Sequence, residues 1–258
     1  MQKRKITINI ENYPQEFWYY LKNSEIFDSS CSKEAQVIYI KNHDCYLKVS
    51  QKNSLKREAQ LDDYFYKKGL SSKVVKYLSD EKDWLLTEAV KGEDCTHYLE
   101  NPVKLCDTTA EILYNLHNLD CSDCPIKIRT KEYIETVQKN YENGMYDTSL
   151  FPDNWGYTSA EEAYNIFSKN KDILKNDTLI HGDYCLPNIL LDNYKFSGFI
   201  DLGNGGIADK HIDIFWGAWT LNFNLKTEKY TERFFDAYGK NNFNKEILKL
   251  ISACEVFG

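Results

Sequence analysis

The fold of this chain is decided by the stretch His181-Gly182-Asp183-Tyr184-Cys185-Leu186-Pro187-Asn188, followed by Gly198-Phe199-Ile200-Asp201-Leu202-Gly203. It sets the carboxylate of Asp183, the carboxamide of Asn188 and the carboxylate of Asp201 at a fixed spacing. A positioned carboxylate can accept the proton of a hydroxyl, and amide and carboxylate oxygens are the hard ligands that Mg²⁺ takes. Asp201 directly follows an apolar strand, where an unpaired charge is costly unless it meets a cation. The stretch therefore indicates proton transfer beside a divalent metal ion.

The spacing matches that of H-R-D-x-x-x-x-N followed by D-F-G, the catalytic signature of protein kinases. Here Gly182 stands in place of the arginine. In that template the first aspartate orients and deprotonates the accepting hydroxyl, and the asparagine and second aspartate hold Mg²⁺ on a nucleoside triphosphate. We therefore expect Asp183 to be catalytic and Asn188 and Asp201 to be metal ligands. The alternative is structural: an isolated aspartate or asparagine here would be a turn or cap residue.

Lys48 lies in an alternating, strand-like stretch at residues 45–49. In kinases a strand lysine contacts the α- and β-phosphates and pairs with a glutamate on the next helix. Glu58, in a helix predicted over residues 54–68, is the expected partner. Taken alone, Lys48 would be read as a solvated strand residue. The chain has no G-x-x-x-x-G-K-[ST] motif, so the motifs exclude a P-loop enzyme.

The remaining pattern predicts an α+β architecture with two lobes. Runs rich in β-branched and aromatic residues predict strands at residues 6–10, 35–40, 45–49 and 84–90. After Gly92 cap residues and apolar periodicity predict helices that begin near residues 102, 130, 160, 227 and 244, and three short strands lie around Leu179, Ile189 and Phe199. We expect a nucleotide-binding lobe at residues 1–90, with a hinge at about 87–92, and a catalytic and acceptor-binding lobe at residues 91–258.

Composition narrows the class of protein. The chain has 258 residues, 42% of them hydrophobic, and a net charge of -7. No basic stripe is visible, which argues against a nucleic-acid partner, and no apolar run is long enough to span a membrane. The eight cysteines lack the paired spacing of a zinc site, which favours reduced thiols in a cytoplasmic protein. We expect a monomer.

The assembled motifs resemble those of the aminoglycoside phosphotransferases, and in particular the 3'-phosphotransferase branch. The similarity extends over nearly the whole chain and is most specific at residues 181–188, 197–214, 121–125 and 255–257. The resemblance implies a bilobal protein-kinase-like fold and a cytoplasmic antibiotic-resistance enzyme. It implies transfer of the γ-phosphate of ATP, with Mg²⁺, to an aminoglycoside hydroxyl, the 3'-hydroxyl being expected. GTP remains open as an alternative donor.

The resemblance also implies roles for individual residues. Tyr46 would stack on the nucleotide base, the backbone of Thr87 and Ala89 would bond the base edge, and Ile200 would pack beneath the base. A strand aromatic in the core is the structural alternative for Tyr46. The residues that fall on acceptor-binding positions of the family are Asp153, Glu255 and Phe257.

The acceptor half departs from the family pattern. An acidic pair expected after the helix of Trp219 is replaced by Phe223-Asn224, and an acid expected near Asp153 is replaced by Gly156. Each charge-assisted hydrogen bond contributes about 1.5–3 kcal/mol, so these losses predict weaker or narrower aminoglycoside binding. Two alternatives therefore stay open: a kinase of another small hydroxyl compound, such as choline or a sugar, and a nucleotide-binding pseudokinase. The presence of all four kinase-type residues argues against the second.

Overall fold

The computed structural model describes residues 3–33, 35–149, 151 and 153–258. The chain forms two compact units: unit 1 consists of Met1–Cys95 with Pro187–Gly203, and unit 2 of Thr96–Leu186 with Asn204–Gly258. The strand-rich unit thus includes residues 187–203, which the sequence pattern had placed with the helical half. The reason is strand pairing, because β9 (Ile189–Asp192) pairs antiparallel with β7 (Glu93–Asp94) and with β10 (Lys195–Phe199).

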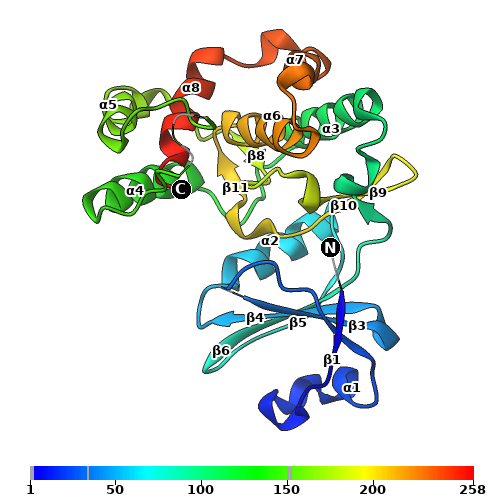
Figure 1. The fold of residues 1–258 in the computed structure, drawn as a ribbon. Helices are drawn as coiled ribbons and strands as arrows, with labels where there is room; N and C mark the ends of the chain where they lie inside the picture. Colours follow the sequence, from blue (N-terminus) through cyan, green and yellow to red (C-terminus); the bar gives the residue numbers. More distant parts are fainter. Residues whose placement is uncertain (1–2, 34, 150, 152) are drawn as a thin grey trace. The chain divides into compact units, whose positions relative to one another are not determined.

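Unit 1 is built on a six-stranded antiparallel sheet of order β1-β2-β3-β4-β6-β5 (Figure 1). The strands are β1 (Arg4–Ile6), β2 (Ile26–Asp28), β3 (Gln36–Ile40), β4 (Cys45–Gln51), β5 (Val74–Ser79) and β6 (Lys82–Glu88). Successive side chains of a strand point to opposite faces. Leu47 therefore joins a buried cluster with Trp84, near the short helix α1 (Trp18–Leu21), whereas Lys48 and Leu85 pair on the other face. Helix α2 (Lys56–Lys67) packs on that second face through Ala59.

A tight hairpin completes unit 1. Asn193 and Tyr194, between β9 and β10, both have positive φ, at 52° and 63°, as a two-residue type I′ turn requires. The hairpin brings the residue before β9 beside the residue after β10: the Ile200 N–H donates to the Asn188 carbonyl at 3.1 Å. The side chains of Asn188 and Asp201 therefore originate from the same end of one hairpin.

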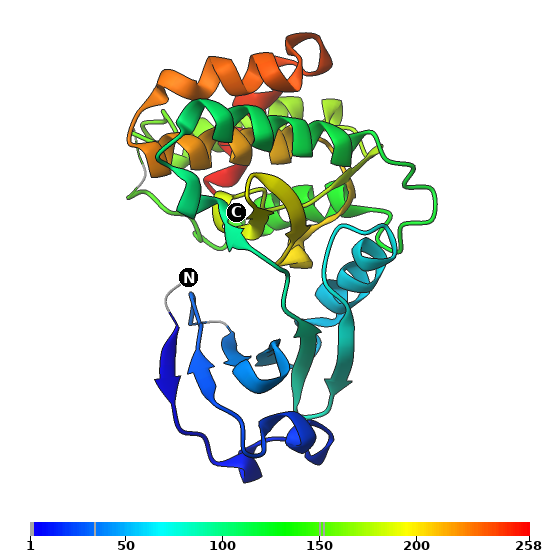
Figure 2. The ribbon, with the colours of Figure 1, turned by 90° about the vertical axis from the view of Figure 1, so that its right-hand side faces the viewer.

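Unit 2 is mainly helical. Its helices are α3 (Pro102–His117), α4 (Arg129–Glu142), α5 (Ala160–Asn170), α6 (His211–Leu225), α7 (Thr231–Tyr238) and α8 (Lys245–Glu255), joined by a two-stranded sheet of β8 (Thr178–Ile180) and β11 (Gly206–Ala208). Figure 2 shows α3 alongside the orange helices α6 and α7. Asn101 and Ser159 cap α3 and α5 by accepting backbone N–H groups, as their sequence context predicted. Asn244, which we expected as the approximate start of the last helix, caps α8 in the same way.

At three places the observed elements differ from those expected from the sequence, and each difference has a clear cause. Strand β1 ends at Ile6, because Asn9 caps a 3₁₀ turn at Ile10–Asn12 where we expected the strand to continue. Thr227 caps a short 3₁₀ helix, Glu228–Tyr230, and α7 begins only after it. Periodicity alone did not predict α6, the helix of Trp219 that the family resemblance implied, because the helix is apolar on most of its circumference and lies largely buried.

The structure also bears on the expectations about membrane spans and about the cysteines. Over the described parts of the chain, no helix combines the length and the apolar character needed to cross a membrane. All eight cysteines are free thiols.

Candidate active site

Lys48 is the centre of a charged cluster in unit 1. Its Nζ lies 2.8 Å from both carboxylate oxygens of Glu58 and 2.7 Å from Oδ1 of Asp201. A β-strand, a helix and the end of a hairpin thus place one ammonium between two carboxylates. The side chains of Lys48 and Glu58 are only 20% and 8% exposed, whereas that of Asp201 is 53% exposed. The ion pair with Glu58 is therefore shielded from solvent and the one with Asp201 is not.

The cluster carries more carboxylates than cations. Burial alone would lower the pKa of Lys48, but the two carboxylates outweigh it and raise that pKa. Burial raises the pKa of Glu58, and Lys48 opposes this effect. One helical turn further along α2, burial and the charge of Glu58 raise the pKa of Asp62 well above its ordinary value. Asp62 was not among the predicted site residues, although its i,i+4 spacing from Glu58 on a helix was a usable signal.

Asp201 is held in the left-handed region, with φ of 61°. Such backbone conformations are costly for a non-glycine residue and concentrate at functional sites. Asn188, which is only 8% exposed to solvent, lies at the same end of the hairpin as Asp201. The oxygen donors of Asn188 and Asp201 are of the hard type that suits Mg²⁺, and the excess of carboxylates favours a cation. These residues therefore fit a magnesium ion.

The residues expected to contact the nucleotide base all lie in unit 1: Tyr46 on β4, Thr87 on β6, Ala89 just after β6 and Ile200 just after β10. Tyr46 is half-buried, pairs in register with Thr87 and packs at 5.0 Å against the ring of Tyr39. The Ala89 N–H donates to the Asp44 carbonyl at 2.8 Å, so this group already has an acceptor. Ile200 is half-buried beside Asn188. The structure therefore brings these residues into one unit, with the amide of Ala89 engaged.

Asp183 lies in unit 2, in the loop that follows β8. Its own N–H donates to Nδ1 of His181 at 3.3 Å, and its carbonyl accepts the Cys185 N–H at 2.8 Å. His181 is fully buried and packs edge-on against Tyr184. Asp183 is thus positioned by short-range contacts within its loop, and the predicted metal ligands belong to unit 1.

Asp213, on α6, was not among the predicted site residues but fixes the loop of Asp183. Its carboxylate is fully buried and accepts the N–H groups of His181 and Gly182 at 2.7 and 2.8 Å. His117, on α3, lies 3.3 Å from the same carboxylate. Charge-assisted hydrogen bonds of this kind are about twice as strong as neutral ones. Asp213 therefore ties the loop of Asp183 to the helical core.

Steric crowding explains why residue 182 is a glycine. Its φ is +85°, and a Cβ there would lie 2.0 Å from the carbonyl oxygen of Asn204. That same carbonyl accepts Nε of Arg129 at 2.9 Å. The position that is arginine in the protein-kinase signature therefore has no room for a side chain here.

The three predicted acceptor residues have different surroundings. Asp153 is exposed in a turn. Glu255, at the end of α8, accepts the Tyr133 hydroxyl at 2.6 Å, and burial raises its pKa to about 7, with a further contribution from Asp183. Phe257 is 1% exposed and packs edge-on against Tyr141. The structure thus places the ring of Phe257 in the core rather than at a surface, and places Glu255 within electrostatic reach of Asp183.

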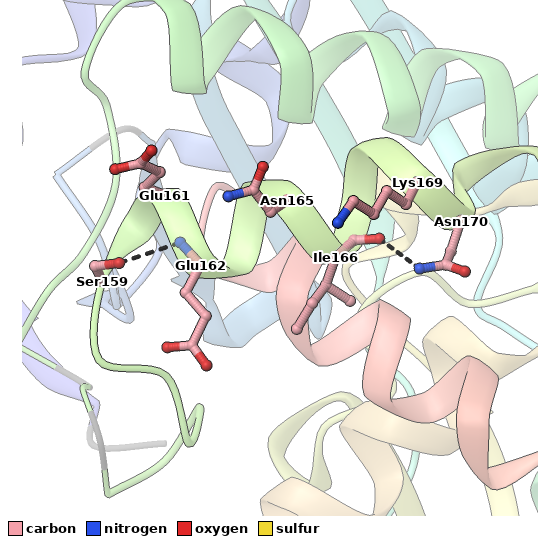
Figure 3. Close-up of a pocket in the computed structure, with 7 residues that line it drawn as sticks. All are labelled: Ser159, Glu161, Glu162, Asn165, Ile166, Lys169 and Asn170. Atoms are coloured by element: carbon pink, nitrogen blue, oxygen red, sulfur yellow. Dashed lines mark hydrogen bonds between the residues drawn. The ribbon is translucent and has the colours of Figure 1, made fainter.

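Unit 2 also carries a surface depression that is lined by residues 159–170 only. It has a volume of about 500 Å³ and runs along the outer face of α5 (Figure 3). The two hydrogen bonds drawn there are internal to the helix: Ser159 caps Glu162, and Asn170 donates to the Ile166 carbonyl. Its lining therefore consists of an ordinary solvated helix face and contains none of the predicted site residues.

Comparison with known proteins supports the assignment of family. Residues 42–251 match the family described as the phosphotransferase enzyme family. A protein of Lactococcus lactis named probable aminoglycoside 3'-phosphotransferase is 48% identical over 99% of this chain and 98% of its own length. An aminoglycoside 3'-phosphotransferase of Niallia circulans is 30% identical over 64% of this chain and 63% of its own length.

Solved structures of aminoglycoside phosphotransferases share the fold of this chain. A crystal structure of an aminoglycoside 3'-phosphotransferase of type VIII has a TM-score of 0.75 at 20% identity, covering 99% of this chain and 94% of that one. An aminoglycoside phosphotransferase of Streptomyces rimosus, in complex with ADP and streptomycin, has a TM-score of 0.73 at 19% identity, covering 86% and 90%. The predicted α+β, kinase-like fold class is confirmed. This chain belongs to the phosphotransferase enzyme family.

Proposed function

We propose that this chain transfers the γ-phosphoryl group of a nucleoside triphosphate to a hydroxyl of an aminoglycoside. The observation that carries the proposal is the position of Lys48, within 2.8 Å of both Glu58 and Asp201. This is the arrangement that a kinase needs at the phosphates, and it joins residues that are far apart in the sequence. The aminoglycoside as acceptor, and its 3'-hydroxyl, are supported by the name of the relative that is 48% identical over nearly the full chain.

The roles of the residues follow from their chemistry. Lys48, held by Glu58, would donate hydrogen bonds to phosphate oxygens. Asp183 would accept the proton of the attacking hydroxyl and orient its oxygen. Asn188 and Asp201 would hold Mg²⁺, which when bound neutralises charge on the phosphates. Phosphoryl transfer depends mainly on positioning and electrostatics. The hydrogen bonds and ion pairs that hold these side chains in place therefore matter as much as the side chains themselves.

ATP is the donor that we propose, with GTP as the alternative, and we propose that the protein acts as a cytoplasmic monomer. Binding of nucleotide is supported by the ADP complex of the Streptomyces rimosus neighbour. Size-exclusion chromatography with light scattering tests the monomer, and competition between the two nucleotides tests the donor.

The decisive experiment measures ADP release, by a coupled assay, with kanamycin and neomycin as acceptors. We expect turnover by the wild-type protein, and a reduction of about 10²- to 10⁴-fold in Asp183→Ala, the usual contribution of a positioned general base. Asp172→Ala removes an exposed carboxylate from the same unit and should retain wild-type turnover. Near-normal turnover of Asp183→Ala would refute the role of Asp183.

One observation favours a second acceptor class. Where the family pattern has an acidic pair, Phe223 is 52% exposed and Asn224 donates to Thr220 within α6. Neither side chain supplies a carboxylate for a polycation, so a smaller amino alcohol or a sugar is the second candidate. Choline and simple sugars therefore belong in the same acceptor panel. Turnover with choline but with neither drug would replace the first proposal by the second.

A further inference from the structure

A carboxylate on the six-stranded sheet of unit 1 lies at the start of helix α2. Asp83, on β6, is fully buried, and its Oδ2 accepts the Leu55 N–H at 2.9 Å. The first N–H groups of a helix have no acceptor within the helix, and a side chain of the residue before the helix often accepts one of them. Leu55, which precedes α2, has an apolar side chain and cannot do so. Asp83 therefore caps α2 from the neighbouring strand.

Two further donors fix the Asp83 carboxylate. The hydroxyl of Tyr77 donates to Oδ2 at 3.0 Å, and that of Ser79 donates to Oδ1 at 2.6 Å. Both donors lie on β5, where Ser79 pairs directly with Asp83. Burial alone would raise the pKa of Asp83, but the hydrogen bonds that it accepts outweigh this effect and lower the pKa. The carboxylate is therefore ionised, and hydrogen bonds to an ionised acceptor are about twice as strong as neutral ones.

The capped end of α2 is the end that carries Glu58. This residue lies in the first turn of the helix, and both of its carboxylate oxygens lie 2.8 Å from Nζ of Lys48. Lys48 pairs with Leu85 of β6, which is two residues from Asp83 and therefore on the same face of the sheet. One face of the sheet thus holds α2 at two successive points: Asp83 binds Leu55, and Lys48 binds Glu58 one turn later.

We propose that Asp83 is a positioning residue of the phosphate-binding site, because it fixes the first turn of α2 and thereby the carboxylate that orients Lys48. The inference rests on the proposed function, in which Lys48 donates to phosphate oxygens. Helix ends fray when their first N–H groups lack acceptors. Fraying would separate Glu58 from Lys48 and leave the ammonium to Asp201 alone. Nucleotide affinity then falls with the fraction of molecules in which the site is assembled.

The first test measures nucleotide binding without turnover. Isothermal titration calorimetry gives the Kd of AMP-PNP, a nonhydrolysable analogue of ATP, in the presence of Mg²⁺. Asp83→Asn keeps the shape of the side chain but places an amide donor where the carboxylate accepts. It should weaken binding about 3- to 10-fold, the usual effect of a lost helix cap. Tyr77→Phe and Ser79→Ala each remove one donor and leave the cap, so each should weaken binding about 2-fold.

Asp80, on the same hairpin, supplies the matched control. Its carboxylate accepts the Lys82 N–H and the ring N–H of Trp84, each at 3.0 Å and both within the hairpin of β5 and β6. Asp80→Asn therefore makes the same chemical change without removing the cap of α2. It should keep the wild-type Kd for AMP-PNP.

A double-mutant cycle separates positioning through Glu58 from a general loss of stability. If Asp83 acts through Glu58, it has no carboxylate left to position in Glu58→Gln, so Asp83→Asn should change the Kd less than about 2-fold in that background. A merely structural role would weaken binding by the same factor in both backgrounds. In the active enzyme, Asp83→Asn should raise the KM for the nucleotide and leave the KM for the aminoglycoside within about 2-fold of wild type.

The outcomes separate this inference from the proposed function. If the wild-type protein binds AMP-PNP but phosphorylates no acceptor in the panel, the proposed transfer fails, and the binding data still test Asp83. If it binds no nucleotide, both fail. Wild-type affinity in Asp83→Asn, or an equal loss in Asp80→Asn, refutes the positioning role.

An undiminished effect of Asp83→Asn in the Glu58→Gln background assigns Asp83 a structural role only and also overturns the inference. If Asp83→Asn does not fold, Tyr77→Phe and Ser79→Ala are tested in its place, and wild-type affinity in both of them refutes the proposal.

Discussion

Replacement of Lys48 by methionine tests whether the charged cluster of unit 1 is as shielded as the structure indicates. Lys48→Met keeps the length of the side chain and removes the ammonium that lies 2.8 Å from Glu58. Glu58 has a side chain that is only 8% exposed, so its charge is left buried without a partner. Removal of one member of a buried pair costs about 3–5 kcal/mol. We expect about 3 kcal/mol at pH 8, the low end, because the second partner, Asp201, is half exposed and regains water.

The effect should depend on pH with a definite sign. Burial already raises the pKa of Glu58, and loss of Lys48 raises it further. A carboxyl whose pKa is higher in the folded state favours folding most below its unfolded pKa, and this contribution is lost as the pH rises through the folded value. At pH 5 the uncompensated Glu58 takes up a proton, so Lys48→Met should lose at least about 1 kcal/mol less there than at pH 8.

The assay is urea unfolding at both pH values, followed by tryptophan fluorescence and analysed at a common m-value. Lys67→Met is the matched control: it breaks the exposed Lys67–Asp63 pair, 2.6 Å apart on the same helix, and exposed pairs contribute about 0–1 kcal/mol. A loss below about 1 kcal/mol for Lys48→Met at pH 8, or an equal loss at both pH values, would refute the argument from burial.

Three further predictions concern unit 2 and its controls. Gly182→Ala should destabilise the protein by more than about 2 kcal/mol in urea unfolding, because its Cβ would clash with the Asn204 carbonyl, whereas Gly69→Ala, also at positive φ but with open space around it, should cost about 1 kcal/mol. Asp213→Asn should cost about 1.5–3 kcal/mol and lower kcat, because one of the two N–H groups that bind Asp213 would face an amide donor; unchanged unfolding and kcat would contradict this. Glu255, whose pKa is about 7, should attract a cationic acceptor only when ionised, so the acceptor KM should rise as the pH falls below about 7 in wild type and lose this component in Glu255→Gln. Because that pKa is raised on folding, Glu255→Gln should also be more stable relative to wild type at pH 8 than at pH 5.

Much of the candidate site was predictable, because its residues are separated by short, fixed intervals in the sequence. The interval between Asp183 and Asn188 and the apolar strand before Asp201 follow from the local chain, and alternation in β4 predicts that Lys48 and Leu47 face opposite sides. The caps of α3, α5 and α8 were predictable for the same reason, since a cap involves residues within one turn. Such features depend on local backbone geometry alone.

The sequence by itself thus determined the α+β class, the identity of the charged residues and the faces on which they lie. Only the tertiary structure decided that residues 187–203 belong with the strand-rich unit, that Asp213 holds the loop of Asp183, and that Phe257 packs in the core. Each of these depends on contacts between residues far apart in the chain. Strand pairing, buried charge-assisted hydrogen bonds and aromatic packing gain their free energy only when distant segments meet, and no local pattern records which segments do so.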